Sequence, residues 1–373
     1  MAQRTEPRRT LYDLYWSDVR NADFRTLFKK ETRGAYEFYA AEFDADVRGG
    51  GKLRRGWRVF WALARAFVRK LSPARRLLFT AIVAAFALAS SGDDWLLAWI
   101  AFVGLLALLG LETAERVMAR DELEAAREIQ TRNTPASAPE FAGYETALFY
   151  ETAREVGGDA IDFARSPESL TALVADASGK GLGAALYAAQ ADVLFRHLFH
   201  DGASPSSALV SLNDALRLAM KPGSFLTAAL ARFGEGGTVR VCRAGHPPPL
   251  VYRAAANEVE ALKPKGIGLG LADRPLFAST LETIETTLEP GDALLLYTDG
   301  ATEAMNRDRV EFGEERLRKV FAKQAPKSAE RALAALAATL DLHRGDAPMN
   351  DDRAIVLVKR AFPSDERREE SAA

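Results

Sequence analysis

The residues best suited to chemistry in this chain are aspartates that stand beside glycine or at the ends of short apolar runs. They are Asp159 after two glycines, Asp176 at the end of LVAD, Asp299 at the end of LLLYTD, and the neighbours Asp351 and Asp352 just before AIVLV. A strand end holds a side chain rigidly, and an adjacent glycine lets backbone and water come close to it. One such aspartate alone would be a turn cap or a solvated loop end. The repeated pattern favours a shared site.

Carboxylates that converge on one point repel one another unless a cation neutralises them. Two divalent metal ions would do so, and they would also lower the pKa of a bridging water and polarise a phosphoryl oxygen. The ligands must be oxygens, because Cys242 and His246 have no second pair with which to complete a zinc site. Oxygen ligands suit Mn²⁺ and Mg²⁺ alike, so the sequence predicts two divalent ions without choosing between these metals.

Composition narrows the classes of protein to consider. The chain has 373 residues, enough for two or more domains, and its formal net charge of -2 does not suggest a nucleic-acid binder. The single cysteine excludes an internal disulfide. The N-terminal MAQRTEPRRT is not followed by the apolar stretch of a signal peptide, which predicts that the chain begins in the cytoplasm.

The first 76 residues are expected to be helical. Residues 1–47 form a predicted helical region with aromatic residues at helical spacing and no assignable chemistry. Residues 48–76 are rich in Lys and Arg, contain no acidic residue, and carry an aromatic stripe that includes Trp57, Phe60 and Trp61. A basic amphipathic helix of this kind suits an anionic membrane surface, although the same pattern also fits a helix packed on protein.

Two uncharged apolar runs, Leu77–Ser91 and Trp95–Leu111, flank a turn at Gly92–Asp94. Each run is short for a spanning helix, which needs about 20 residues, but basic and Trp residues at the ends can extend it. Residues 77–111 are therefore predicted to form a transmembrane helical hairpin, with a buried hairpin or a re-entrant loop as the alternatives. The excess of Lys and Arg before the first run predicts that both termini lie in the cytoplasm.

Residues 112–138 are predicted to be a helical linker. A charged helix with a thin apolar line covers residues 112–130, and Pro135 and Pro139 follow it. This helix could pair weakly as a coiled coil and so support a homodimer, or it could be a plain spacer. The polar tail at residues 363–373 is expected to be disordered.

Residues 139–362 have the pattern of an α+β domain. Strand-like runs outnumber helices, and several follow one another with only turns between them. The runs are TALVADAS, FLTAALARF, GTVRVCRAG, PPLVYRA, ALLLYTDG and AIVLVKRAF, and helices are expected over residues 183–199, 204–220 and 328–343. Strands joined by turns pair antiparallel, so we expect antiparallel sheets covered by helices.

Six segments of this domain, in this order and spacing, resemble the SpoIIE/RsbU branch of the PPM (PP2C-like) protein serine/threonine phosphatases. They are EVGGDAIDF, VADASGKGLGAAL, AGHPPPLVY, GLGLA, EPGDALLLYTDGATEAMN and NDDRAIVLV. The resemblance covers about residues 139–362. It implies a PPM-type β-sandwich of antiparallel sheets flanked by α-helices, with two Mn²⁺ or Mg²⁺ ions bound at one end.

The resemblance also implies a set of metal ligands. These expected ligands are Asp159, Asp176, the backbone carbonyl of Ala177, Asp299 and Asp351, and the four aspartates are also the expected catalytic residues. Asp176 resembles the aspartate that bridges both ions. Asp352 is kept in reserve, because an assignment to one of two adjacent aspartates can slip by one residue.

The activity implied is hydrolysis of phosphoserine or phosphothreonine on a regulatory protein. The implied partner is an anti-anti-sigma (STAS-type) factor in bacterial partner-switching signalling, and the implied location is the bacterial inner (cytoplasmic) membrane with the phosphatase domain in the cytoplasm. The alternative is a membrane-anchored pseudophosphatase that binds a regulator without turnover. Because every acidic position of the family pattern is present, the enzyme is favoured.

Three further polar residues of these segments could contribute to the site. Ser178 stands where a related branch has a histidine that can act as a proton donor, so a leaving-group acid is not identified. Lys180 could contact the substrate phosphate or simply be solvated. His246 is interpreted as structural rather than catalytic.

Overall fold

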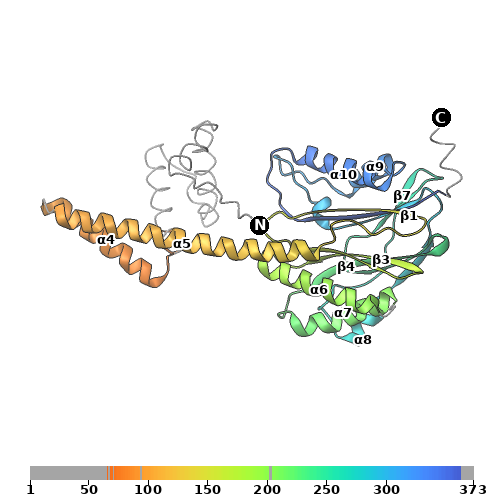
Figure 1. Ribbon diagram of the computed structural model, residues 1–373, viewed down its shortest axis with the longest axis horizontal. Coiled ribbons are helices and arrows are strands. Elements are labelled where there is room, and N and C mark those ends of the chain that lie inside the picture. The colour runs from red at the N-terminus through yellow and green to blue at the C-terminus, as the bar shows by residue number, and fades with distance from the viewer. Residues whose placement is uncertain (1–64, 66–67, 70, 93–94, 201–203, 363–373) are drawn as a thin grey trace, which may run out of the picture. The chain divides into compact units, whose positions relative to one another are not determined.

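The computed structural model describes residues 65, 68–69, 71–92, 95–200 and 204–362 (Figure 1). The predicted helical region at residues 1–47, most of the basic segment at 48–76 and the tail at 363–373 lie outside the described residues. The chain divides into two compact units, Met1–Val117 and Met118–Ala373, and each is described by itself.

The described part of the first unit is a helical hairpin. It consists of α4 (Pro73–Gly92) and the first part of α5 (Trp95–Asn133). Ile82 of α4 packs with Ala101 and Leu108 of α5 in a small buried cluster. At one end of the hairpin, Arg75 pairs with Glu112 at 3.1 Å and also with Glu115. The ion pairs therefore lie at the end of the hairpin where the first apolar run begins and the second one ends.

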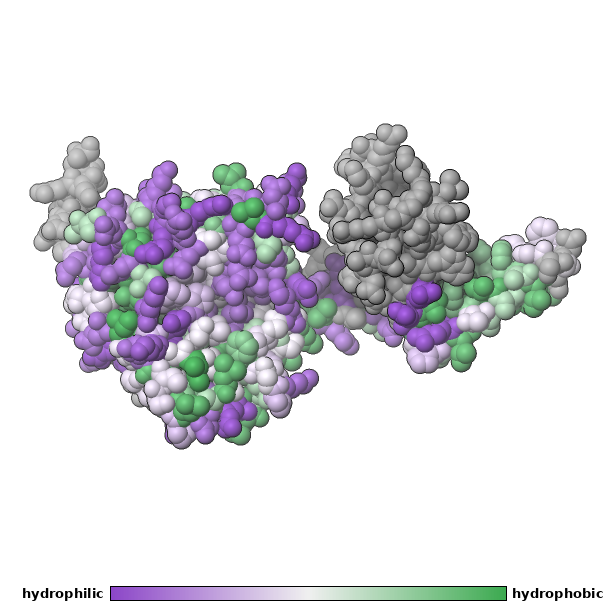
Figure 2. Space-filling view, turned by 180° about the vertical axis from the view of Figure 1, so that it is seen from behind, coloured by the Kyte–Doolittle hydropathy of each residue, from purple (hydrophilic) through white to green (hydrophobic). Residues whose placement is uncertain are grey.

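Most large apolar side chains of this hairpin are exposed, and Figure 2 shows hydrophobic residues at its surface. By length and composition both helices could cross a membrane: Pro73–Ser90 of α4 has a mean hydropathy of 1.4, and an 18-residue stretch of α5 has a mean hydropathy of 2.1. The apolar surface is therefore consistent with the predicted hairpin. The boundary predicted between residues 111 and 112 falls inside α5, which continues to Asn133 without a break.

The second unit is built around two five-stranded sheets in which every neighbouring pair of strands is antiparallel. The first sheet has the order β1 (Tyr144–Glu151), β10 (Arg353–Arg360), β9 (Ala293–Tyr297), β6 (Leu250–Arg253), β7 (Glu258–Ala261). The second sheet has the order β2 (Asp159–Arg165), β3 (Ser169–Ala177), β4 (Leu226–Gly234), β5 (Thr238–Ala244), β8 (Thr283–Thr287). A 3-10 turn, η2 (Glu235–Gly237), joins β4 to β5.

The two sheets face each other and bury one apolar layer between them. Val174 and Ala229 of the second sheet meet Leu294 and Val356 of the first sheet in this layer. Because side chains alternate along a strand, the same strands also present apolar residues outward, where helices cover them.

Helices cover the outer face of each sheet (Figure 1). The second sheet is covered by α6 (Leu182–His200), α7 (Pro205–Ala219) and α8 (Arg274–Thr280), and the first by α9 (Glu314–Gln324) and α10 (Ala329–Arg344). In α7 the Ser204 side chain accepts a hydrogen bond from the Ser207 N–H, and proline follows it at the first helical position. This layered arrangement confirms the predicted α+β fold.

Candidate metal centre

The predicted site residues meet at one end of the two-sheet sandwich. Asp159 opens β2 and lies directly opposite Asp176 near the end of β3. On the first sheet, Asp299 follows β9 in the 3-10 turn η3 (Asp299–Ala301), and Asp351 and Asp352 precede β10. Since β9 and β10 are antiparallel neighbours, the end of one lies beside the start of the other. The structure thus brings together carboxylates from two pairs of adjacent strands.

Thr298 links the two sheets at this end. Its hydroxyl donates to Asp159 Oδ2 at 2.7 Å and accepts from the Ala354 N–H at 3.0 Å. Thr298 and Asp159 are both buried. The Ala354 carbonyl lies farther from the same hydroxyl, at 3.4 Å, so the Asp159 carboxylate is the closer acceptor and Thr298 holds it in place.

Replacing Thr298 with valine keeps the shape of the side chain and removes this hydrogen bond. We expect Mn²⁺ affinity to fall by about 10–100-fold, as is typical when the partner of a metal ligand is lost. Titration calorimetry on the full chain measures this change, with Thr339→Val on α10 as the control. An unchanged affinity in Thr298→Val would show that Asp159 does not need this orientation to bind the metal.

The two glycines before Asp159 lie in a closely packed part of the site, and Gly157 has no room for a side chain. A Cβ on Gly157 would lie 2.7 Å from Thr152 Cγ2 and 2.9 Å from Asp352 Oδ2. A Cβ on Gly158 would lie 3.3 Å from the Ala177 carbonyl oxygen and 3.5 Å from Asp176 Oδ1. The Gly158 carbonyl also accepts from the Ala177 N–H at 3.0 Å. The bare backbone therefore lets the Ala177 carbonyl and the Asp176 carboxylate lie near Asp159.

The two adjacent aspartates before β10 have different surroundings. Asp352 is buried, and its two carboxylate oxygens accept the N–H groups of Ala153 and Gly158, each at 2.7 Å. Asp352 thus holds the loop that leads into β2. Asp351 is about a third exposed, and its Oδ2 contacts the Lys180 ammonium group at 2.7 Å. Of the two, Asp351 has the carboxylate that is accessible to an incoming cation.

Burial and mutual repulsion raise the pKa values of the clustered acids. The pKa of Asp159 lies well above its usual range because of burial and the nearby Asp176 carboxylate. Burial, with the charges of Asp299 and Asp351, raises the pKa of Asp176 to about 7. Burial and Asp351 also raise the pKa of Asp299. Such a cluster favours a bound cation, which would stabilise the ionised carboxylates.

Within the part of the chain that the structure describes, no three carboxylate, imidazole or thiol side chains already form a closed set of metal ligands. The donors nonetheless fit hard cations. They are all oxygens, they come from both sheets, and the charges of neighbouring carboxylates disfavour ionisation without a counter-ion. Divalent cations such as Mn²⁺ and Mg²⁺ match this donor set.

His246 is buried and lies behind the acidic cluster. Its Nδ1 hydrogen-bonds the hydroxyl of Thr227, which stands opposite Asp176 in the pairing of β3 with β4, at 2.8 Å. Burial lowers the pKa of His246 to about 3, so the ring is neutral near pH 7. These contacts agree with the structural interpretation of this residue.

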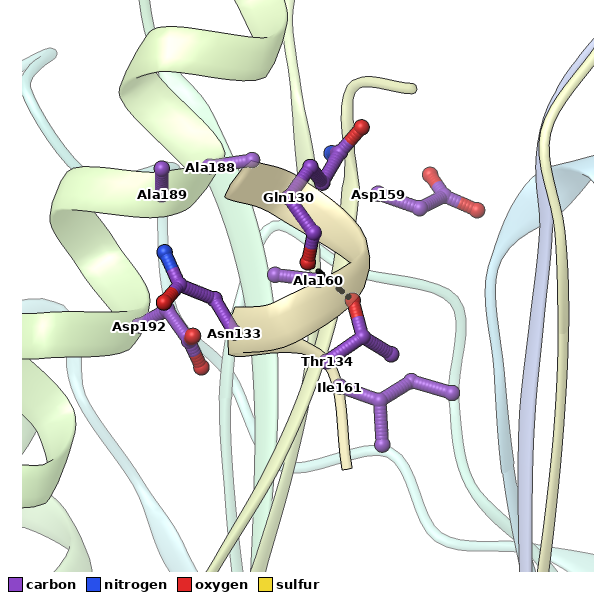
Figure 3. A pocket seen from close by; sticks show the side chains of 9 residues that line it. All are labelled: Gln130, Asn133, Thr134, Asp159, Ala160, Ile161, Ala188, Ala189 and Asp192. Carbon is purple, nitrogen blue, oxygen red and sulfur yellow. Dashed lines mark hydrogen bonds between the residues drawn. The ribbon is translucent and has the colours of Figure 1, made fainter. Parts of the chain in front are cut away.

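The last turns of α5 contribute a contact that the sequence did not reveal. Gln130 Oε1 accepts from the Gly157 N–H at 3.0 Å, and Gln130 Nε2 donates to the Gly157 carbonyl at 2.7 Å. Gln130 therefore holds both polar groups of a residue that stands two positions before Asp159. Figure 3 shows the adjoining pocket, which is lined by Gln130, Asn133, Thr134, Asp159, Ala160, Ile161, Ala188, Ala189 and Asp192.

Arg196 of α6 joins two buried acids at this pocket. Its Nε donates to Asp162 Oδ2 at 2.6 Å, its Nη2 donates to Asp192 Oδ2 at 3.2 Å, and Nη2 also donates to the Asn133 carbonyl. Asp192 Oδ1 is buried without a hydrogen-bond partner among the described residues. Burial and the adjacent Asp162 raise the pKa of Asp192 to about 8. The Arg196 guanidinium group is thus shared between the carboxyl groups of Asp162 and Asp192.

Asp192→Asn is expected to stabilise the domain, and more strongly at pH 8 than at pH 5. The pKa of Asp192 is raised from 3.8 to about 8 by folding, so the stability that its protonated form contributes is lost as pH rises through this interval. Asparagine removes this loss, which at about 1.4 kcal/mol for each unit of this interval amounts to about 5 kcal/mol at pH 8. Thermal unfolding at both pH values measures this loss, with Asp214→Asn, at a partly exposed carboxylate that pairs with Arg274, as the control. An equal change in thermal midpoint at pH 5 and pH 8 would mean that folding does not raise the pKa of Asp192.

Comparison with known proteins identifies the family to which this chain belongs. The family model described as Stage II sporulation protein E (SpoIIE) matches residues 166–361, just over half of the chain. The chain belongs to the SpoIIE family. The matched span of this SpoIIE-family chain contains Asp176, Asp299 and Asp351, and Asp159 stands shortly before it.

Two relatives agree with this membership. The SpoIIE-family chain is 25% identical over 245 residues to the phosphoserine phosphatase RsbU of Bacillus subtilis, a match that covers 65% of this chain and 70% of RsbU. It is 27% identical over 227 residues to Protein IcfG of Synechocystis sp., which covers 53% of this chain. That match spans only 35% of the length of IcfG.

The fold of this SpoIIE-family chain matches that of a solved PP2C domain. The SiaA-PP2C domain of Pseudomonas aeruginosa superposes with a TM-score of 0.57 at 21% identity, covering 67% of this chain and 98% of that domain. This similarity confirms the PPM-type (PP2C-like) sandwich expected from the sequence.

Proposed function

We propose that this chain is a metal-dependent protein serine/threonine phosphatase that hydrolyses phosphoserine or phosphothreonine on a regulatory protein. One observation carries the proposal: aspartates from both sheets meet at one end of the sandwich, with pKa values raised by burial and by one another. Membership of the SpoIIE family and similarity to RsbU, named a phosphoserine phosphatase, support the same activity.

Asp159, Asp176, Asp299 and Asp351, with the Ala177 carbonyl, would hold two divalent cations. When bound, such ions polarise a phosphoryl oxygen and activate water. The protein's own contribution is to hold these ligands still, through the hydroxyl of Thr298 on Asp159 and the loop contacts of Asp352. The Ser178 hydroxyl accepts the Phe225 N–H at 2.8 Å, so it serves the loop backbone.

The anchoring and the partners belong to the same proposal. The exposed apolar surfaces of α4 and α5 support insertion of residues 77–111 in the bacterial inner membrane, with the phosphatase domain in the cytoplasm. The resemblance to the RsbU branch supports a STAS-type anti-anti-sigma factor as the phosphorylated substrate. On the helix at residues 112–130, Met118 and Ile129 are exposed, which supports a homodimer formed through this segment.

Phosphate release by the full chain in lipid, from a phosphoserine-containing STAS protein, tests the activity. We expect release that requires added Mn²⁺ or Mg²⁺ and stops when EDTA removes the metal. If the folded chain bound Mn²⁺ but released no phosphate from any phosphoserine protein, the chain would instead be a binding module.

A further inference from the structure

Lys180 stands on a short loop that projects beside the acidic cluster. The loop at residues 178–181 joins β3 to α6, and both Gly179 and Gly181 have positive φ angles, +97° and +79°. No heavy atom lies within 4 Å of the Cβ position of either glycine. Glycine is needed here for the backbone conformation, since nothing crowds the loop. Lys180 therefore stands on a loop whose two flanking glycines are not crowded by other parts of the protein.

The side chain of Lys180 reaches from one sheet to the other. Its loop follows β3 of the second sheet, yet its ammonium group contacts Asp351 Oδ2 at 2.7 Å and the Asn350 carbonyl at 2.9 Å, just before β10 of the first sheet. The positive charge also lowers the pKa values of Asp299 and Asp352, against the raising effect of burial. Lys180 thus places a cation within the acidic cluster.

The ion pair between Lys180 and Asp351 is exposed enough for either side chain to take another partner. The Lys180 side chain is 50% exposed and that of Asp351 is 31% exposed. A pair with this much access to water contributes only about 0–1 kcal/mol, so it does little to hold the fold together. A divalent cation that binds Asp351 Oδ2 would compete directly with the ammonium group for the same oxygen.

Once released from Asp351, the Lys180 ammonium group could bind the phosphate group of the proposed substrate. A phosphate monoester carries close to two negative charges near pH 7, and lysine binds phosphate as a mobile point charge. The half-exposed position of Lys180, beside carboxylates that would hold the metal ions, places its charge where the phosphoryl group must arrive. The flexible stem of lysine allows this exchange of partners.

We infer that Lys180 is the phosphate-binding residue of this centre: its ammonium group leaves Asp351 when that carboxylate takes up a divalent cation, and it then pairs with the substrate phosphoryl oxygens. This inference rests on the proposed function. It gives Lys180 two opposite effects, since the residue competes with the metal ion and attracts the phosphate.

The test compares the full wild-type chain in lipid with Lys180→Ala and Lys180→Arg. In Lys180→Ala we expect Mn²⁺, titrated without substrate, to bind severalfold more tightly, because the competing cation is gone. We expect KM for the phosphoprotein and the inhibition constant of inorganic phosphate each to rise about tenfold, as befits a lost hydrogen bond to a charged group. Lys180→Arg keeps the charge and should retain most of the phosphate binding.

Lys323→Ala, which removes an exposed lysine on α9, is the matched control and should change none of these quantities. Weaker or unchanged Mn²⁺ binding together with an unchanged phosphate inhibition constant in Lys180→Ala would overturn the inference while leaving the proposed phosphatase intact. A wild-type chain that neither binds Mn²⁺ nor releases phosphate would overturn both the phosphatase and the role of Lys180.

Discussion

Asp176→Asn is expected to abolish Mn²⁺-dependent release of phosphate from a phosphoserine protein. Asp176 lies opposite Asp159 in the second sheet, and the charges of Asp299 and Asp351 of the first sheet act on it, so it stands between both sets of proposed ligands. A bound metal ion contributes several kcal/mol to stabilising charge in the transition state, and each 1.4 kcal/mol is about tenfold in rate. We therefore expect a loss of at least about a thousandfold, measured as phosphate release at saturating Mn²⁺.

The same variant should remain folded. Asparagine keeps the size of the side chain and removes a carboxylate whose ionisation is opposed by burial and by its neighbours. Asp214→Asn, which removes a partly exposed carboxylate on α7 outside the acidic cluster, is the control and should keep full activity. Substantial Mn²⁺-dependent turnover by a folded Asp176→Asn chain would place the reaction at some other site.

Gly300→Ala is expected to disrupt the centre by forcing apart the two strand ends of the first sheet. A Cβ on Gly300 would lie 1.8 Å from the Asp352 carbonyl oxygen and 2.9 Å from its carbonyl carbon. No contact that close is possible, so η3 or the segment at Asp351 must move. We expect a loss of about 3 kcal/mol of stability, or roughly 6–12 °C in thermal midpoint, with a fall in Mn²⁺ affinity.

Gly183→Ala makes the same chemical change where there is room. No heavy atom lies within 4 Å of the Cβ position of Gly183, which stands in the first turn of α6. This control should match the wild type in Mn²⁺ binding, and its thermal midpoint should not fall, because alanine is the better helix former. Equal behaviour of the two glycine variants would mean that η3 does not pack against Asp352 as described.

The sequence predicted the central strands better than the edge strands. The runs that became β3, β4, β9 and β10 are apolar along nearly their whole length because both of their faces are covered. Two of the four edge strands, β7 (EVEA) and β8 (TIETT), alternate exposed and half-buried residues, so they lack a continuous apolar run. They form because the neighbouring strand offers backbone hydrogen bonds, which a local pattern does not show.

The aspartates of the acidic cluster were predictable from the sequence, but the contacts that hold them in place were not. Aspartate at a strand end beside glycine is a local signal, and it pointed to the residues that the fold brings together. The contacts that hold them are long-range: Thr298 reaches Asp159 across 139 residues, and Gln130 reaches Gly157 across 27. No spacing in the sequence specifies such pairs, because they depend on how the two sheets and α5 pack.

The proposed phosphatase depends on one two-metal centre formed by aspartates from both sheets. The most direct measurement is the number of Mn²⁺ ions bound per chain at equilibrium, for the wild type, for Asp159→Asn on the second sheet and for Asp299→Asn beside the first. We expect two ions in the wild type and weakened binding in each variant, since each sheet supplies part of the ligand set. A wild-type chain that binds no Mn²⁺, or variants that bind it as the wild type does, would mean that these aspartates do not form a metal centre.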